Sequence, residues 1–223
     1  MNTARIAHAA LALVVFAVLH LGGTAVSSAQ EWQDGPAPTG YHLSFRASGV
    51  SPFSVNTTSA TLSPATIRTR PGYDIGVGMG HRFHALRIEG RIMYGRFEAD
   101  SIRFADGGGA LSGYFDLRGA TIELLYDLPV GGRLRHYVGA GLAAVGFRAR
   151  DVALASFPPT IGDNTLLAQQ FTAGVSYGTD AWRLLLGYRY LGTGAQDYET
   201  GGIPLRGEPL RTHAIQVGTQ FSF

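Results

Sequence analysis

From Thr39 to the C-terminus, apolar and polar residues alternate with a period of two, which is the signature of β-strands whose two faces meet different surroundings. Long runs of this alternation are separated by segments rich in Gly, Pro, Ser and Asp, which indicate turns and loops. The pattern predicts eight strands, at 40–48, 72–82, 85–97, 113–127, 135–148, 166–178, 181–191 and 211–223.

The connections between these strands differ in length in a regular way. Those after the second, fourth and sixth strands are short, whereas those near 49–71, 98–112, 149–165 and 192–210 are long. Because antiparallel neighbours place successive connections at opposite rims, short turns gather at one rim and long loops at the other. This is the layout of bacterial outer-membrane barrels. We therefore predict an all-β fold, an eight-stranded antiparallel up-and-down transmembrane β-barrel.

The two faces of each predicted strand differ in chemistry. In strand 181–191, Leu184 and Leu186 share one face, and Arg183 and Arg189 share the other. The polar faces are rich in glycine, which fits a narrow lumen, so we expect the apolar faces to meet lipid. Aromatic residues lie at both ends of the apolar faces, as in the two headgroup layers around a membrane barrel. A β-sandwich core, the alternative, gives no reason for that placement. The predicted lipid-interface aromatics are Tyr41, Tyr126, Tyr137, Tyr177, Trp182 and Phe223 at the short-turn rim, with Tyr73, Tyr94, Phe171, Tyr190 and also Phe147 at the long-loop rim.

Two strands fit this scheme poorly. Strand 135–148 has small or apolar residues on both faces, and strand 113–127 places Asp116 and Arg118 on the lipid-facing side. An arginine at the centre of a bilayer costs about 2–4 kcal/mol, and much less near its surface. Two explanations stay open. Either Arg118 lies at the outer rim, or a β-bulge near Gly119 turns its side chain inward.

The first thirty residues have the layout of a secretory signal peptide. Arg5 precedes an apolar run from Ala9 to Leu21, and small residues precede Gln30. The run is shorter than the roughly 20 residues of a membrane-spanning helix, so we expect cleavage after Ala29 rather than a membrane anchor. The expected division is a cleaved signal peptide at 1–29, a periplasmic lead at 30–38 and the barrel at 39–223.

Composition narrows the possible functions. The formal net charge of the 223-residue chain is only +2, so nucleic acid is not an expected partner. The chain has no cysteine, which excludes disulfides, thiolate nucleophiles and zinc–thiolate sites. His81 and His84 are too closely spaced along a strand to share a face, so we predict a turn there and no metal or other cofactor.

Several short motifs resemble the small outer-membrane barrels of the opacity-protein and OmpA-like surface-antigen type. They are Tyr137–Leu142, Ala173–Tyr177, Gly187–Tyr190 and the terminal Gln220–Phe223. The resemblance implies a location in the outer membrane of a Gram-negative cell, among lipid and lipopolysaccharide. It also implies delivery by periplasmic chaperones to the barrel-assembly machinery, with Val217, Phe221 and Phe223 as the assembly signal. The chain ends at the barrel, so we do not expect a peptidoglycan-binding role.

Charged residues on the inward faces form the candidate functional site. An eight-stranded barrel has an interior just wide enough for side chains, where charges must be paired or hydrated. We favour a static network that plugs the lumen. The alternative is a narrow gated pore in which Glu89 and Glu123 exchange arginine partners. The predicted lumen network is Arg46, Arg87, Glu89, Arg91, Glu123, Arg183 and Arg189, with Asp74 and Asp127 as further inward charges.

Enzymatic activity is not expected. Lipid-modifying barrels need a nucleophile and a base at the outer leaflet, but His213 is the single mature histidine near the long-loop rim, and strand 181–191 lacks the His-Ser pairing of a deacylase.

For the long loops, we favour mobile, solvated segments, although Phe53, Phe157 and Ile203 could contact a host or neighbouring surface. We expect a structural or adhesive surface antigen that displays four extracellular loops. A narrow channel is the second possibility and a lipid-modifying enzyme the third.

Overall fold

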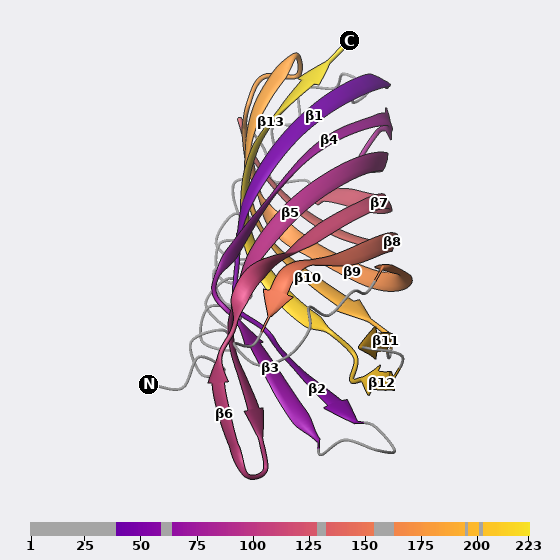
Figure 1. Cartoon of the computed structure of the whole chain (residues 1–223). Coiled ribbons are helices and arrows are strands. Elements are labelled where there is room, and N and C mark those ends of the chain that lie inside the picture. The colour runs from indigo at the N-terminus through magenta and orange to yellow at the C-terminus, as the bar shows by residue number, and fades with distance from the viewer. Residues whose placement is uncertain (1–38, 59–63, 129–132, 154–162, 195, 201–202) are drawn as a thin grey trace.

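The computed structural model of the chain consists of β-strands joined by short turns (Figure 1). It describes residues 39–58, 64–128, 133–153, 163–194, 196–200 and 203–223. The predicted signal peptide and periplasmic lead lie outside these residues and stay predictions. Within the described part of the chain, no helix is long and apolar enough to cross a membrane.

Eight antiparallel strands form a closed barrel, which confirms the predicted fold. Each strand pairs with its sequence neighbour in the barrel, and β1 pairs with β13 to close the ring. The observed strands agree with the predicted ones within a few residues at the short-turn rim and extend further at the long-loop rim. The barrel strands are β1 (Gly40–Val50), β4 (Gly72–Phe83), β5 (Leu86–Phe104), β7 (Ser112–Leu128), β8 (Leu134–Ala153), β9 (Asp163–Gly178), β10 (Trp182–Thr193) and β13 (Arg211–Ser222).

Tight turns join the strands at one rim. Phe83 pairs with Leu86, so only two residues connect β4 to β5, and His84 adopts a positive φ of 57° there. Histidine is among the residues that tolerate this conformation in a turn. The predicted turn at His81–His84 is therefore correct, with His81 still in the strand and its ring in edge-to-face contact with Tyr41 and in tilted contact with Phe83.

The long connections contain strands of their own, which the sequence did not predict. The hairpin of β2 (Ser54–Thr58) and β3 (Ala65–Thr69) pairs with the outer end of β5, and β6 (Gly107–Ala110) folds back on β5. The hairpin of β11 (Gln196–Thr200) and β12 (Ile203–Gly207) pairs with β2. These strands form a second sheet beyond the barrel (lower part of Figure 1). These segments therefore form paired strands where irregular loops were expected, because hydrogen bonding continues from the barrel strands into them.

As predicted, apolar side chains cover the outer face of the barrel wall and charged side chains lie on its inner face. Large apolar residues such as Met79, Ile92 and Leu167 are exposed on the outside, at 62%, 69% and 70%. Arg87 and Glu89 are buried inside at 1% each. A soluble protein exposing this much contiguous apolar surface would aggregate or associate, whereas lipid chains cover it favourably.

Strand β8 corrects one part of the aromatic prediction. Tyr137 and Phe147 were expected to face lipid, but both are buried in the lumen, while Val138 and Leu142 are exposed outside. Both faces of this strand are small or apolar, so alternation alone could not assign them. The strand carries its large inward residues at its two ends, and these resemble interface aromatics in sequence.

The position of Arg118 is also settled by the register. β5 and β7 pair without interruption from Leu86 with Tyr126 to Glu98 with Tyr114, so no bulge occurs near Gly119. Arg118 is exposed on the outer face and pairs across strands with Tyr94. Of the two explanations for its position, the outer-rim placement is the correct one.

Candidate functional site

Inward glycines make room in the lumen for long charged side chains. A Cβ atom at Gly78 would lie 3.0 Å from Glu89 Oε1, and one at Gly76 would lie 3.1 Å from the Cδ atom of Arg91. A Cβ atom at Gly80 would lie 2.6 Å from His42 Cε1. Each of these β4 glycines is thus covered by a polar side chain from a neighbouring strand. This close packing accounts for the Gly-x-Gly-x-Gly pattern of β4.

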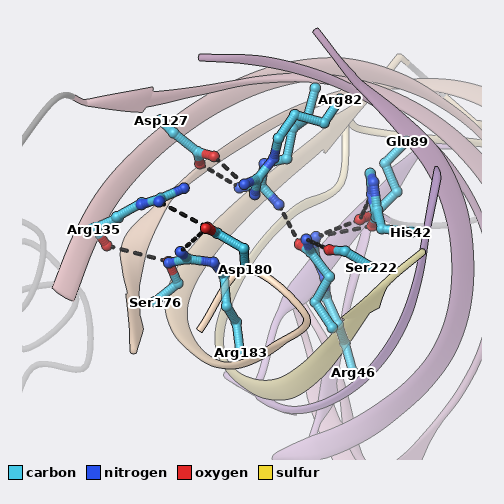
Figure 2. A network of polar contacts seen from close by, with 12 residues as sticks. His42, Arg46, Arg82, Glu89, Asp127, Arg135, Ser176, Asp180, Arg183 and Ser222 are labelled. Atoms are coloured by element: carbon cyan, nitrogen blue, oxygen red, sulfur yellow. Dashed lines mark hydrogen bonds and ion pairs between the residues drawn. The ribbon is translucent and has the colours of Figure 1, made fainter. Parts of the chain in front are cut away.

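The centre of the network is an ion pair between β1 and β5. Arg46 Nη2 lies 2.8 Å from Glu89 Oε1, and His42 Nε2 lies 3.3 Å from Glu89 Oε2 (Figure 2). Glu123 is more distant, with its Oε2 atom 3.8 Å from Arg46 Nη1 and 3.7 Å from Arg91 Nη2. All of these side chains are buried, so their charges are compensated by one another rather than by bulk solvent.

A second group of ion pairs lies towards the short-turn rim. Asp127 accepts a hydrogen bond from Arg87 Nη2 at 2.7 Å and forms an ion pair with Arg82 Nη2 at 3.1 Å. Arg87 also donates to Gln220 Oε1 at 2.6 Å, which connects β5 across the lumen to β13. The Arg87 guanidinium lies 5.6 Å from the centre of the Tyr137 ring, so the inward tyrosine supports the network.

Three further ion pairs extend the network towards the two rims. At the short-turn rim, Arg135 and Arg183 converge on Asp180, at 2.9 and 3.2 Å (Figure 2). Towards the long-loop rim, Arg189 forms an ion pair with Asp74, which also accepts a hydrogen bond from Ser48 Oγ at 3.0 Å. The charged network therefore runs through the inner part of the lumen and ends near Asp74.

Beyond Asp74 the lumen is filled by apolar side chains, which the sequence analysis missed. The sequence prediction named only the charged inward positions, although the inward positions at the long-loop end of most strands are apolar. That apolar pattern is the signal that could have found them. The outer apolar cluster consists of Val50, Val55, Met93, Phe97, Leu117, Ala143, Val145, Phe147, Ala168, Leu191, Leu210 and Ala214.

Residues of the predicted lumen network all point inward and are buried. Six of them meet in the contacts described above around Glu89, Glu123, Asp127 and Asp74, whereas Arg183 pairs only at the short-turn rim. His42, Arg82, Tyr137 and Gln220 also take part but were not predicted. His42 and Gln220 occupy inward positions that alternation identifies. Their contacts, however, depend on cross-lumen geometry that a single strand does not reveal.

Several buried polar atoms of the lumen lack a protein partner. The three guanidinium nitrogens of Arg91 make no hydrogen bond, and neither do the side-chain amides of Gln170 and Gln216. In folded proteins such groups usually bind ordered water. The inner lumen is therefore chemically suited to water, whereas the outer apolar cluster is not.

The predicted interface aromatics other than Tyr137 and Phe147 lie on the outer surface. Tyr41, Tyr126, Tyr177, Trp182 and Phe223 are exposed near the short-turn rim. Near the long-loop rim, Tyr73 and Phe171 are exposed, while Tyr94 and Tyr190 are half-buried. Val217 and Phe221 of the predicted assembly signal also face outward. Within the described residues, no three metal-binding side chains gather in one place.

Comparison with known proteins supports the fold. No protein-family model and no curated protein sequence matches the chain. Among solved structures, the outer membrane protein OprG from Pseudomonas aeruginosa is similar with a TM-score of 0.58 and 14% identity, over 86% of this chain and 99% of that one.

Two other solved structures are similar at the same level. Outer membrane protein AlkL, determined in lipid bilayers, has a TM-score of 0.53 and 20% identity, over 86% of this chain and 94% of that one. Neisserial surface protein A has a TM-score of 0.51 and 19% identity, over 83% of this chain and 99% of that one. The apolar exterior and this shared architecture agree with the outer-membrane location expected from the sequence. The chain therefore has the fold of the small outer-membrane β-barrels, the type of protein that its sequence resembles.

Proposed function

We propose that the protein is a non-enzymatic surface scaffold. Its barrel anchors the second sheet, which consists of β2, β3, β6, β11, β12 and the outer end of β5 and is called the platform below. This platform serves structural or adhesive contacts outside the cell. The observation that carries this proposal is the continuity of β5, which runs from Leu86 in the barrel to Phe104 in the second sheet. A strand shared by both sheets transmits the rigidity of the barrel to the platform. A binding surface held in this way loses less conformational entropy on contact than a mobile loop does.

The platform is polar and internally bonded. Arg70 reaches Glu98 and Asp100, at 3.3 and 3.2 Å, and Asn56 donates a hydrogen bond to Glu208 at 2.8 Å. Hydrogen bonds from its guanidinium to Asp100 and Glu98 raise the pKa of Arg70 above its ordinary value. These contacts tie the residue after β3 to β5, and β2 to the segment before β13. They favour one defined surface for protein or glycan ligands.

Phe53 is not one of the exposed tips of this platform. Its ring packs edge-to-face on Phe97 at 5.1 Å and covers the outer apolar cluster. Because its ring packs on the cluster, Phe53 is less suited to contact an external surface than an exposed apolar tip would be. Phe157 and the side chain of Ile203 lie outside the described residues.

The lumen supports a scaffold better than a channel. The inner lumen is lined by charged groups, but Phe97, Val145 and Leu191 belong to an apolar cluster that fills the next segment. Apolar constrictions of this kind exclude water and ions. The lumen ion pairs then serve to hold the barrel together rather than to conduct.

The absence of catalysis in this proposal rests on the placement of the histidines. His42 and His136 are buried in the inner half of the barrel, away from the outer leaflet. His213 lies at the outer half, where its Nδ1 atom contacts the Tyr188 hydroxyl and its ring packs against Tyr190. Those contacts suit an interface aromatic cluster rather than a base beside a nucleophile.

Adherence of cells that express the full chain tests the proposal. Cells carrying the wild-type protein should adhere to an epithelial layer more than cells with an empty vector. Replacing 57–64 with a two-residue turn should remove the gain, because it shortens the β2–β3 hairpin while keeping Phe53 and Val55. Both proteins should show the same heat-modifiable gel mobility. Equal adherence of wild-type and empty-vector cells would overturn the adhesive role.

A further inference from the structure

A cluster of arginines lies on the lipid-facing side of the barrel, where charges are rare. Arg96 Nε and Arg150 Nε bind the two carboxylate oxygens of Asp116, at 2.9 and 2.6 Å. Tyr94 donates its hydroxyl hydrogen to the same carboxylate at 2.9 Å, and Arg118 is next to Tyr94 across strands. Two guanidinium groups thus bind one carboxylate, and Arg118 lies beside them without binding it, so the positive charge of these three arginines exceeds the charge of Asp116.

Arg118 carries much of this excess. Its side chain is exposed and makes no hydrogen bond or ion pair with any described residue. An unpaired arginine on the lipid face of a barrel is tolerated near the membrane surface, where it can meet an anion. No described residue therefore neutralises Arg118, and an anion bound at the surface would do so.

The height of the cluster matches the outer headgroup layer. On β7, eight residues separate Tyr126 at the short-turn rim from Arg118, or about 26 Å along the strand. With a typical tilt near 40°, that is roughly 20 Å across the membrane, and Asp116 lies about 5 Å higher. Because the apolar band of such barrels is about 25 Å tall, Asp116 lies with Arg96 and Arg150 where the lipid phosphates begin, and Arg118 lies about 5 Å below them, within reach of its long side chain.

An apolar groove leads to this cluster across the outer face of the barrel. It has a volume of about 1020 Å³ and crosses β9, β10, β13, β1, β4 and β5. Its sides are two adjacent rows of outward side chains, one containing Phe45 and Val77, the other containing Val217 and Ile75. The backbone of the inward residues between them, including Gly218 and Gly76, forms its floor.

The groove and the cluster are continuous. The second row ends at Tyr94, which lines the groove, and the next residue along the same hydrogen-bonded row is Arg118. The surface therefore offers a long apolar trough with a cationic end. An amphiphile with an acyl chain and a phosphate complements both parts.

We propose that this surface is a binding site for one phosphorylated lipid of the outer leaflet. Its acyl chain lies in the groove, and its phosphate is held by Arg118, Arg150 and Arg96. Charge complementarity selects this occupant, because a neutral acyl chain leaves Arg118 unpaired and a second copy of this chain would bring a like-charged cluster. The inference is independent of the adhesive role proposed above.

Lipid binding to the full-length protein in phosphatidylcholine nanodiscs tests the proposal. The probe is bis-phosphorylated lipid A, and native mass spectrometry counts the lipid that stays bound. The wild-type protein should bind one molecule in preference to dephosphorylated lipid A. Arg118→Ala and Arg150→Ala should each weaken binding about tenfold, the effect of losing one charge-assisted hydrogen bond. Arg211→Ala is the matched control, because Arg211 is also exposed at the outer end of a strand.

A second variant separates the contribution of the groove to lipid binding from that of the arginines. Ala47→Trp places a large ring in the groove without altering the cluster, so it should weaken lipid A binding but not the binding of inorganic phosphate. Equal binding of phosphorylated and dephosphorylated lipid A would overturn the proposal, as would an equal loss in Arg211→Ala. A dimer in place of the lipid complex, or full competition by inorganic phosphate at millimolar concentration, would also overturn it.

Discussion

Glu89→Gln removes a buried negative charge that Arg46 and His42 contact at the centre of the lumen. Arg46 Nη2 lies 2.8 Å from Glu89, His42 lies 3.3 Å from it, and these side chains are 1–3% exposed. Removing one partner of a buried pair leaves the other uncompensated, which costs about 3–5 kcal/mol. The distant Glu123, 3.8 Å from Arg46, compensates only part of that charge. We therefore expect a loss of about 3 kcal/mol or more in the free energy of unfolding.

Urea unfolding of the refolded barrel in phosphatidylcholine vesicles measures this loss. Tryptophan fluorescence reports the unfolding, and the gel mobility of unheated samples reports the folded fraction. Glu98→Gln is the matched control, because it removes the same charge from an exposed pair with Arg70, and exposed pairs contribute little. The double variant Arg46→Met/Glu89→Gln should recover much of the stability. Equal losses in Glu89→Gln and Glu98→Gln would refute the assignment of Glu89 to a buried network.

The remaining predictions concern the lumen, the barrel wall and assembly. Single-channel recordings in planar bilayers should show almost no conductance for the wild-type barrel, and Phe97→Ala/Leu191→Ala should raise it by opening the outer apolar cluster; an open wild-type pore would contradict the scaffold. Glu89→Ala should leave the conductance unchanged, and a change would instead support the gated pore. Gly80→Ala should destabilise the barrel by about 1–3 kcal/mol in urea unfolding, because the added Cβ atom meets His42 and the Ile88 carbonyl. Gly90→Ala is the control and should be tolerated, because the atom nearest to a Cβ at Gly90 is 3.9 Å away. Deleting Phe223 should lower the amount of assembled barrel in outer-membrane fractions, and unchanged assembly would reject the terminal signal.

The barrel could be predicted from the sequence because its two environments impose opposite chemistry on alternate residues. Leu184 and Leu186 meet lipid, and Arg183 and Arg189 meet the lumen, so the period of two is plain along most of each strand. The same reasoning failed in β8, where Val138 outside and Gly139 inside are both compatible with either face. The inward position of Tyr137 depends on its neighbours Gly174 and Gly187, which leave space for its ring.

The outer sheet could not be predicted for a different physical reason. Segments such as β2 and β6 are polar or glycine-rich and carry no alternation, so they lack an intrinsic strand signal. They become strands because the outer end of β5 offers unpaired backbone groups to both β3 and β6. The pairing partners in the lumen network are similarly non-local, as in the contact of Arg87 with Gln220, 133 residues away.

Lipid accessibility along one strand tests the inside-out arrangement of the wall most directly. The native chain has no cysteine, so single cysteines at positions 184 to 187 of β10 can carry a nitroxide label without background. In lipid vesicles, labels replacing Leu184 and Leu186 should be relaxed strongly by oxygen, which partitions into the bilayer. Labels replacing Leu185 and Gly187 should be shielded from it. The reverse alternation, with oxygen reaching 185 and 187 instead, would contradict a barrel whose apolar side chains face lipid and whose charges fill its interior.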